Sequence, residues 1–220
     1  GGESEKYKKF IIDGFNYTVP GDISSASFIV AAALLVPGSN INIKNVLFNQ
    51  RRVGLISILR KMGAKIKISN IRMIQFEKVA DINVKYSKLL RSVILSKQDV
   101  INMIDEIPVF ALIACYASGS TLLNHALELR YKESDRIKAI VYNLKKCGAK
   151  ISELPDGFVI KKSKLLYSTR IKNFNDHRIA MMCEVLCFIS TGRFNNVENK
   201  IINTSFPDFY KQISKLYEEI

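Results

Sequence analysis

Residues 26–46 read ASFIVAAALLVPGSNINIKNV, and this stretch carries the pattern that organises the whole chain. Its first half, Ala26–Val36, is apolar on all sides, which predicts a helix buried on every face. Pro37 and Gly38 end that helix, and Asn40–Val46 then alternates polar and apolar residues as a half-buried strand does. The stretch therefore predicts an inner helix followed by a strand with one face toward solvent.

The same order of elements recurs and predicts three copies of one supersecondary unit. An amphipathic helix over Arg52–Met62 and a short strand over Lys65–Ile68 complete the first unit. The later units are expected to repeat a buried helix, a strand and an amphipathic helix, over Pro108–Ala117, Ser120–Asn124 and Ser134–Cys147, and over Ile179–Ser190, Val197–Ile202 and a helix from Phe206. The repeats predict an α/β fold with buried helices and outer sheets.

The composition supports a folded core, because 48% of the 220 residues are hydrophobic and 24% are charged. The longest uncharged run, Ile23–Ile43, is broken by serines, Pro37 and Gly38, so we expect no membrane span. The four cysteines form no CxxC pair, and neither a metal site nor a disulfide framework is expected; reduced thiols predict a cytoplasmic location. Because the sequence starts with Gly1 instead of Met, we expect it to be part of a longer protein.

The charge of the chain is strongly positive, with 33 Lys+Arg against 20 Asp+Glu and a net charge of +13. This balance leaves three classes open: a basic module that binds nucleic acid, a protein that handles small anionic metabolites, and a folded scaffold domain. The lysines are scattered among amphipathic segments and do not form one basic tract. Acids stand among the basic residues at the helix junctions, which argues against nucleic acid as a partner.

Cations occupy helix starts, where the helix dipole disfavours them by about 0.3–1 kcal/mol each. Arg51 and Arg52 precede the second helix, and Arg178 follows an expected cap at Asn175 or Asp176. Lys132 and Arg136 bracket the start of another helix, whose expected cap is Ser134. Free backbone N–H groups and cations together suit phosphate or carboxylate binding. Arg51 and Arg52 could equally extend into water, and removing Arg136 or Arg178 is expected to cost little stability.

Carboxylates stand at the same junctions. Asp105 lies three residues before Pro108, which suits a first helical turn, while Glu133 and Asp135 adjoin Arg136. Either aspartate could be an ordinary helix cap. Taken together, however, these acids and cations all precede helices of repeated units, so they can converge on one anionic ligand.

Five strings in this order resemble the carboxy-terminal half of the 5-enolpyruvylshikimate-3-phosphate synthase family: GDISSAS (21–27), IDEIP (104–108), LRYKESDR (129–136), DHRIAM (176–181) and SFPDF (205–209). The resemblance runs from about Tyr17 to the end of the chain, and KESDR with DHRIAM is its most specific part. The related enolpyruvyl transferase acting on UDP-N-acetylglucosamine shares the architecture but is not similar at these two strings. A domain of that second type is the alternative.

The resemblance implies an inside-out α/β barrel of two globules, each built from three βαβαββ-like units, with the active site between them. Residues 1–20 would be a strand or hinge segment and 21–220 the carboxy-terminal globule, with units at about 21–80, 81–170 and 171–220. The implied reaction transfers the enolpyruvyl group of phosphoenolpyruvate to the 5-hydroxyl of shikimate 3-phosphate, without metal or organic cofactor. The implied partners are these small molecules and a missing amino-terminal globule; the protein is expected to be a monomer, with no nucleic-acid or membrane partner.

The resemblance also assigns roles to site residues. Asp105 resembles the carboxylate that binds shikimate 3-phosphate at its attacking hydroxyl and deprotonates it, and Lys132 resembles a second contact to that substrate. Glu133 resembles the acid that exchanges a proton with the methylene carbon of phosphoenolpyruvate. Arg136 and Arg178 resemble the clamps on phosphoenolpyruvate. His177 would be a neighbour that orients Arg178 or Glu133, or one that only caps its helix. Where some relatives carry a lysine before the Ser/Thr-Phe-Pro string, this chain has Thr204.

Overall fold

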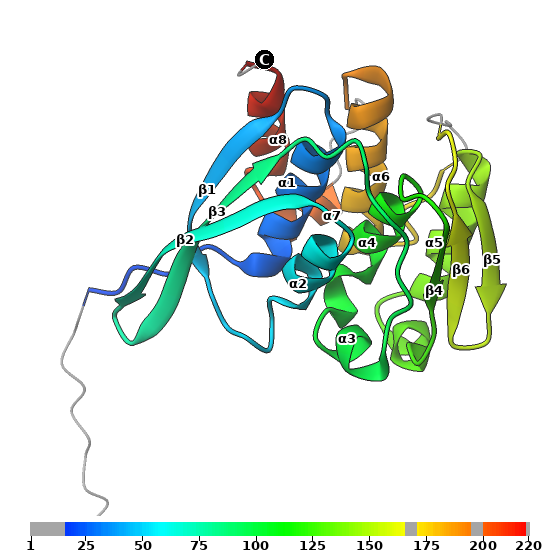
Figure 1. The fold of residues 1–220 in the computed structure, drawn as a ribbon, viewed down its shortest axis with the longest axis horizontal. Helices are drawn as coiled ribbons and strands as arrows, with labels where there is room; N and C mark the ends of the chain where they lie inside the picture. Colours follow the sequence, from blue (N-terminus) through cyan, green and yellow to red (C-terminus); the bar gives the residue numbers. More distant parts are fainter. Residues whose placement is uncertain (1–15, 166–170, 195–199, 219–220) are drawn as a thin grey trace, which may run out of the picture.

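Three apolar helices pack against one another in the centre of the molecule: α1 (Ile23–Leu35), α4 (Ile107–Ala114) and α6 (His177–Thr191) (Figure 1). The structure, a computed structural model, describes residues 16–165, 171–194 and 200–218. All eight residues of α4 are buried, as are most residues of α1 and α6. The prediction that the first helix of each unit is buried on all sides is confirmed.

The first unit places a three-stranded antiparallel sheet over α1. It contains β1 (Asn40–Leu47), α2 (Gly54–Lys61), β2 (Lys65–Ile74) and β3 (Glu77–Lys85), with strand order β1-β3-β2. Ile41 and Ile66 both pair with Val84 on the central strand, whose side chain is fully buried. In β1, the exposed Asn40 and Asn42 alternate with the half-buried Ile41 and Ile43, so the predicted one-sided strand is confirmed.

The second unit repeats this arrangement. It contains α4, β4 (Ser120–Leu123), α5 (Arg136–Lys146), β5 (Lys150–Leu154) and β6 (Gly157–Lys161), with strand order β4-β6-β5. A parallel bridge precedes each sheet: Gly21 pairs with Val46 in the first unit, and Arg91 pairs with Ser118 in the second. These bridges stand where the leading strand of a βαβαββ unit belongs.

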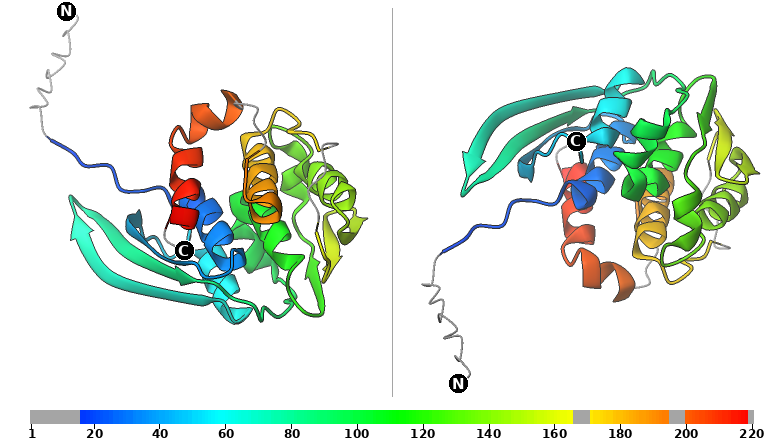
Figure 2. Two further views of the ribbon diagram at one scale, coloured as in Figure 1. Left: turned by 90° about the horizontal axis from the view of Figure 1, so that it is seen from above. Right: turned by 90° about the horizontal axis from the view of Figure 1, so that it is seen from below.

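Short helices join the units. Helix α3 (Lys97–Ile101) begins at Ser96, whose side chain forms a capping box with Asp99. Two 3₁₀ helices follow, η1 (Ile104–Glu106) directly before α4 and η2 (Leu127–Tyr131) before α5. The views in Figure 2 show the two sheets on the outside of the helices, at opposite ends of the molecule.

The third unit departs from the prediction. The strand expected over Val197–Ile202 is wrong at its carboxyl end, because Lys200–Ser205 forms helix α7; residues 195–199 lie outside the described residues. Ile202 is fully buried in the core, and a short apolar run of this kind fits a helix as well as a strand. Helix α8 (Phe209–Glu218) follows, and its Phe209 and Ile213 pack inward as the sequence predicts.

One predicted helix cap is also corrected. Asp135, and not Ser134, caps α5, because its carboxylate accepts a hydrogen bond from the Lys138 amide at 3.0 Å. A carboxylate at this position also meets the positive end of the helix dipole. The Ser134 hydroxyl is therefore available for a different contact, with Asp176.

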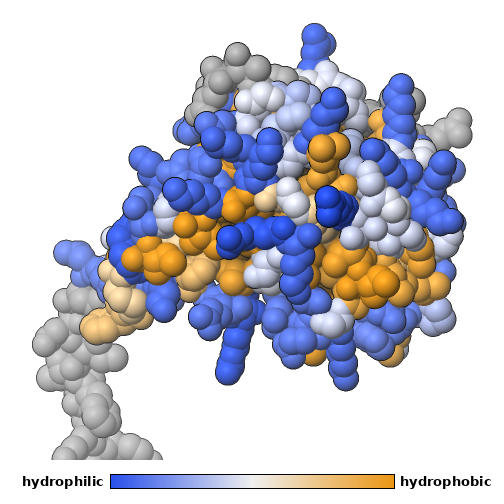
Figure 3. Space-filling model, viewed as in Figure 1, coloured by the Kyte–Doolittle hydropathy of each residue, from blue (hydrophilic) through white to orange (hydrophobic). Residues whose placement is uncertain are grey.

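The surface is mostly polar, with apolar patches between charged side chains (Figure 3). One lies near the β2–β3 hairpin, at whose end Phe76 is 98% exposed. Among the described residues, no helix is both long enough and apolar enough to cross a bilayer.

Gly157→Ala tests the close approach of β6 to β4. A Cβ at Gly157 would lie 2.0 Å from the carbonyl oxygen of Leu123, and this neighbour is backbone that cannot rotate away. We expect the substitution to lower the free energy of unfolding by about 1–3 kcal/mol in urea titrations. Gly21→Ala is the matched control, because its nearest neighbour would be an ordinary 3.5 Å away. Equal stability of the two variants would contradict the packing described.

Candidate active site

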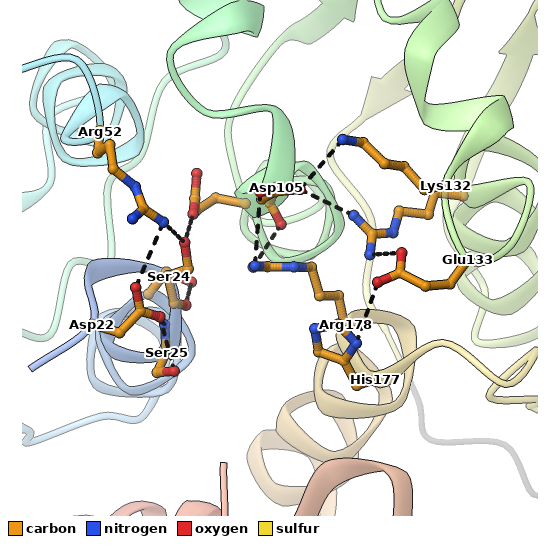
Figure 4. Close-up of polar contacts among 12 residues, drawn as sticks. Asp22, Ser24, Ser25, Arg52, Asp105, Lys132, Glu133, His177 and Arg178 are labelled. Atoms are coloured by element: carbon orange, nitrogen blue, oxygen red, sulfur yellow. Dashed lines mark hydrogen bonds and ion pairs between the residues drawn. The ribbon is translucent and has the colours of Figure 1, made fainter. Parts of the chain in front are cut away.

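Three helix starts meet at one place (Figure 4). The turn η1 carries Asp105 to the start of α4, the loop before α5 carries Lys132 and Glu133, and α6 begins with His177 and Arg178. The central packing of α4, α5 and α6 brings these starts together. Residues separated by up to 73 positions in the sequence thereby share one polar cluster.

Arg136 lies at the centre of the cluster, and its side chain is only 1% exposed. Its Nε donates to Asp176 Oδ2 at 2.7 Å. One terminal nitrogen, Nη2, donates to Glu133 Oε2 at 2.5 Å, and the other, Nη1, donates to Asp105 Oδ1 at 3.3 Å. A planar guanidinium holds its donors in a fixed geometry, so Arg136 fixes the mutual positions of three carboxylates.

Asp176 is the fully buried partner of Arg136. It caps α6, accepting hydrogen bonds from the Arg178 amide at 2.9 Å and the Ile179 amide at 3.3 Å, and the Ser134 hydroxyl donates to it at 3.1 Å. Burial acts to raise the pKa of Asp176. The hydrogen bonds and positive charge of Arg136, with the two helix amides, outweigh burial and hold that pKa below its ordinary value.

Asp105 faces cations from two further elements. Lys132 Nζ lies 3.9 Å from its Oδ1, and Arg178 Nη2 lies 3.8 Å from its Oδ2. Arg178 also donates to the backbone carbonyl of Asp105 at 3.1 Å. The Asp105 side chain nevertheless remains 37% exposed, so a hydroxyl group from a ligand can reach this carboxylate.

Glu133 is held from two sides and is 47% exposed. Its Oε2 accepts from Arg136, and its Oε1 lies 3.7 Å from His177 Nδ1. The pKa of His177 is lowered, first by burial and then by the charge of Arg178, which together outweigh the nearby acids Asp176 and Glu133. A neutral imidazole beside a partly open carboxyl group is therefore favoured near neutral pH.

The structure brings together all six residues that the sequence analysis proposes: Asp105, Lys132, Glu133, Arg136, His177 and Arg178. Thr204 lies in α7, where its hydroxyl donates to the Lys200 carbonyl, so its side chain supplies no positive charge.

Sequence reasoning missed the central role of Asp176 and a buried carboxylate at Glu106. The only feature of the sequence that could have pointed to Glu106 is its position next to Asp105. Within the described part of the chain, no group of His, Cys, Asp and Glu is arranged to hold a metal ion.

Comparison with known proteins agrees with this geometry. The fold matches the EPSP synthase of Acinetobacter baumannii with a TM-score of 0.86 and 33% identity, over 94% of this chain and 48% of that one. It also matches the enolpyruvyl transferase NikO of Streptomyces tendae in fold, with a TM-score of 0.59 and 15% identity, over 88% of this chain and 42% of that one. The architecture is thus the α/β fold of the enolpyruvyl transferases.

The family follows from the sequence match. The family model of EPSP synthase (3-phosphoshikimate 1-carboxyvinyltransferase) matches residues 5–213, and the chain belongs to this family. It is 48% identical to the 3-phosphoshikimate 1-carboxyvinyltransferase of Endomicrobium trichonymphae over 201 residues, which are 90% of this chain and 46% of that protein. The chain spans about half the length of the curated relatives it matches.

Arg136→Ala tests the centre of the cluster. The substitution leaves Asp176 buried without its ion-pair partner, and we expect it to lower the free energy of unfolding by about 3–5 kcal/mol. The structure thus reverses the expectation that Arg136 is dispensable for stability. Arg178→Ala is the comparison, because Arg178 contacts the more exposed Asp105, and its loss is expected to be smaller. Urea denaturation measures both, and a larger loss in Arg178→Ala would contradict the arrangement.

The pH dependence of stability tests Asp176. Because its pKa is lower in the folded chain than in the unfolded chain, the unfolded chain binds more protons in acid. The stabilisation is therefore present above about pH 4, the ordinary aspartate value, and is lost as the pH falls through the lower folded-state pKa. We expect Asp176→Asn to be less stable at neutral pH and to lose less stability on acidification. If the free energy of unfolding changed with pH by the same slope in the parent and in Asp176→Asn, the lowered pKa of Asp176 would be refuted.

Proposed function

We propose that this chain is the carboxy-terminal half of a 3-phosphoshikimate 1-carboxyvinyltransferase, which transfers the enolpyruvyl group of phosphoenolpyruvate to the 5-hydroxyl of shikimate 3-phosphate and releases phosphate. The observation that carries the proposal is a pair of partly exposed carboxylates, Asp105 and Glu133, held by one buried guanidinium at three helix starts. Membership of the family supports the choice of reaction.

The two carboxylates suit the two proton transfers of this reaction. Asp105 takes the proton of the attacking hydroxyl, whose oxygen bonds to C2 of phosphoenolpyruvate, while Glu133 donates a proton to C3. The product of this addition is a tetrahedral adduct with a methyl group. Glu133 then takes a proton back from the methyl group as the C2–O bond to phosphate breaks, which restores the double bond. The proton that Asp105 took from the hydroxyl passes to the departing phosphate, so both carboxyl groups return to their starting forms.

The cations of the site have two roles in this proposal: Lys132 and Arg178 bind substrates, and Arg136 also orients a carboxylate. In this proposal Lys132, which lies beside Asp105, contacts shikimate 3-phosphate, and Arg178 binds the phosphate or carboxylate of phosphoenolpyruvate. Arg136 completes that clamp while it orients Glu133. His177, neutral beside Glu133, is a neighbour that orients this carboxyl group.

The partner that completes the enzyme is an amino-terminal globule. The chain spans about half of its relatives, and its described face presents helix starts that a second globule can close over. Closure excludes water and strengthens the ion pairs of the site. We further propose that the full protein is a cytoplasmic monomer that uses neither metal nor organic cofactor.

Phosphate release from shikimate 3-phosphate and phosphoenolpyruvate tests the proposal. We expect no detectable release by the 220-residue chain alone and release after the amino-terminal half is supplied. In the completed enzyme, Asp105→Asn should lower kcat at least tenfold, about 1.4 kcal/mol in the barrier, because an amide cannot accept the proton.

Asp135→Asn is the matched control, since Asp135 caps α5 and pairs with Arg130 away from the exposed carboxylates. Its kcat should stay close to that of the parent. Turnover by the chain alone would show that the site is complete within these residues and would refute the partner proposal. Salt-sensitive binding of nucleic acid with no response to either metabolite would favour the basic-module alternative.

A further inference from the structure

A second polar cluster lies beside Asp105 and takes no part in the proton transfers described above. It joins Asp22, Ser24, Arg52 and Glu106, at the starts of α1, α2 and α4 (Figure 4). Glu106 is only 5% exposed, and its Oε1 accepts a short hydrogen bond from the Ser24 hydroxyl, which is itself buried. The two residues are 82 positions apart in the sequence.

The Ser24 hydroxyl also contacts Arg52. Its Nη2 lies 3.4 Å from the Ser24 hydroxyl oxygen, and a guanidinium can only donate. The Ser24 hydroxyl oxygen accepts from Arg52, and the hydroxyl donates its single proton to Glu106 Oε1. Asp22, 3.6 Å from Arg52, holds that guanidinium in place. The hydrogen bonds of the cluster therefore run in one direction, from Arg52 through Ser24 to Glu106.

Stability alone does not explain a carboxylate at this position. Burial raises the pKa of Glu106, against the hydrogen bond from Ser24 and the charges of Arg178 and Arg52, so the folded chain keeps an ionisable group at a cost. An apolar side chain of similar volume is often as stable or more stable than a buried charge. The carboxylate is therefore a candidate for a role other than packing.

Glu106 shares the single turn η1 with Asp105. Arg136 and Arg178 hold this turn from α5 and α6, through the carboxylate and the backbone carbonyl of Asp105. The bond from Ser24 to Glu106 holds the same turn from α1, on the opposite side. Asp105 is therefore fixed from both sides, and one of the two attachments depends on Glu106.

We propose that Glu106 is a positioning residue for the reaction, and that its hydrogen bond from Ser24 sets the direction in which Asp105 faces the attacking hydroxyl. This inference rests on the proposed function. It predicts that the hydrogen bond, more than the negative charge of Glu106, governs the chemical step.

Steady-state kinetics of the completed enzyme test the proposal. Ser24→Ala removes the donor, and Glu106→Met removes the acceptor at similar side-chain length. Each is expected to lower kcat at least tenfold while KM for both substrates changes less than about threefold, because only the base is misplaced. The double variant should be no slower than the slower single variant, since both remove one interaction.

Two controls separate positioning from structure and charge. Ser27→Ala removes a second buried hydroxyl of α1, which donates to the Ser24 carbonyl and not to Glu106, and it should keep the parental kcat. Glu106→Gln keeps an acceptor for Ser24 and should recover most of the kcat lost in Glu106→Met. A Ser24→Ala variant as fast as Ser27→Ala, or a Glu106→Gln variant as slow as Glu106→Met, overturns the proposal.

A measurement without substrates distinguishes this proposal from the proposed function. In the 220-residue chain, the ¹³Cγ resonance of Asp105 and the ¹⁵Nε resonance of Arg178 should move in Ser24→Ala and stay in place in Ser27→Ala. An inactive parent enzyme with these shifts present refutes the reaction and leaves the positioning intact. Unchanged resonances in Ser24→Ala refute the positioning, whatever the activity of the parent.

Discussion

The buried ion pair between Arg136 and Asp176 is the constraint on which the rest of the site depends. Arg136 begins α5 and Asp176 caps α6, so their 2.7 Å contact fixes where two helices start relative to each other. A buried ion pair usually adds little net stability, because removing two charges from water costs as much as their attraction returns. Its effect here is geometric: the remaining donors of Arg136 place Glu133 and Asp105.

The charge of the site is nearly balanced, which bears on how it would bind anions. Three cations, Lys132, Arg136 and Arg178, face four carboxylates, Asp105, Glu128, Glu133 and Asp176, and Glu128 lies 2.5 Å from Lys132. An anionic ligand must therefore compete with carboxylates that already contact these cations. A second globule would supply further positive charge and exclude water, which supports the proposal that the active site is shared between two halves.

Polarity patterns predicted most of the architecture, because buried helices and half-exposed strands leave different periodicities in the sequence. The strand predicted at Val197–Ile202 failed at Lys200–Ile202, where three residues are too few to distinguish a helix from a strand. The six site residues were predictable from their junction positions and from the family strings. The burial of Arg136 and the contact of Ser24 with Glu106 were not, because both depend on packing between distant segments. The boundary at residue 20 between a hinge segment and the globule stays a prediction.

Repetition of the unit explains why the residues of the candidate site lie at the starts of helices. Each unit places an aspartate at the start of its buried helix: Asp22, Asp105 and Asp176. In the first two units, an arginine at the start of the second helix pairs with that aspartate, Arg52 with Asp22 and Arg136 with Asp105. The carboxylates of Asp22 and Asp176 accept hydrogen bonds from amides in the first turns of α1 and α6. The first turn of α4 contains Pro108 and receives no side-chain cap bond, so the Asp105 carboxylate caps no helix. The repeat therefore places an aspartate near the start of each buried helix, and Asp105, one residue before the cap position of α4, keeps its carboxylate free of helix capping, which supports the base role proposed for it.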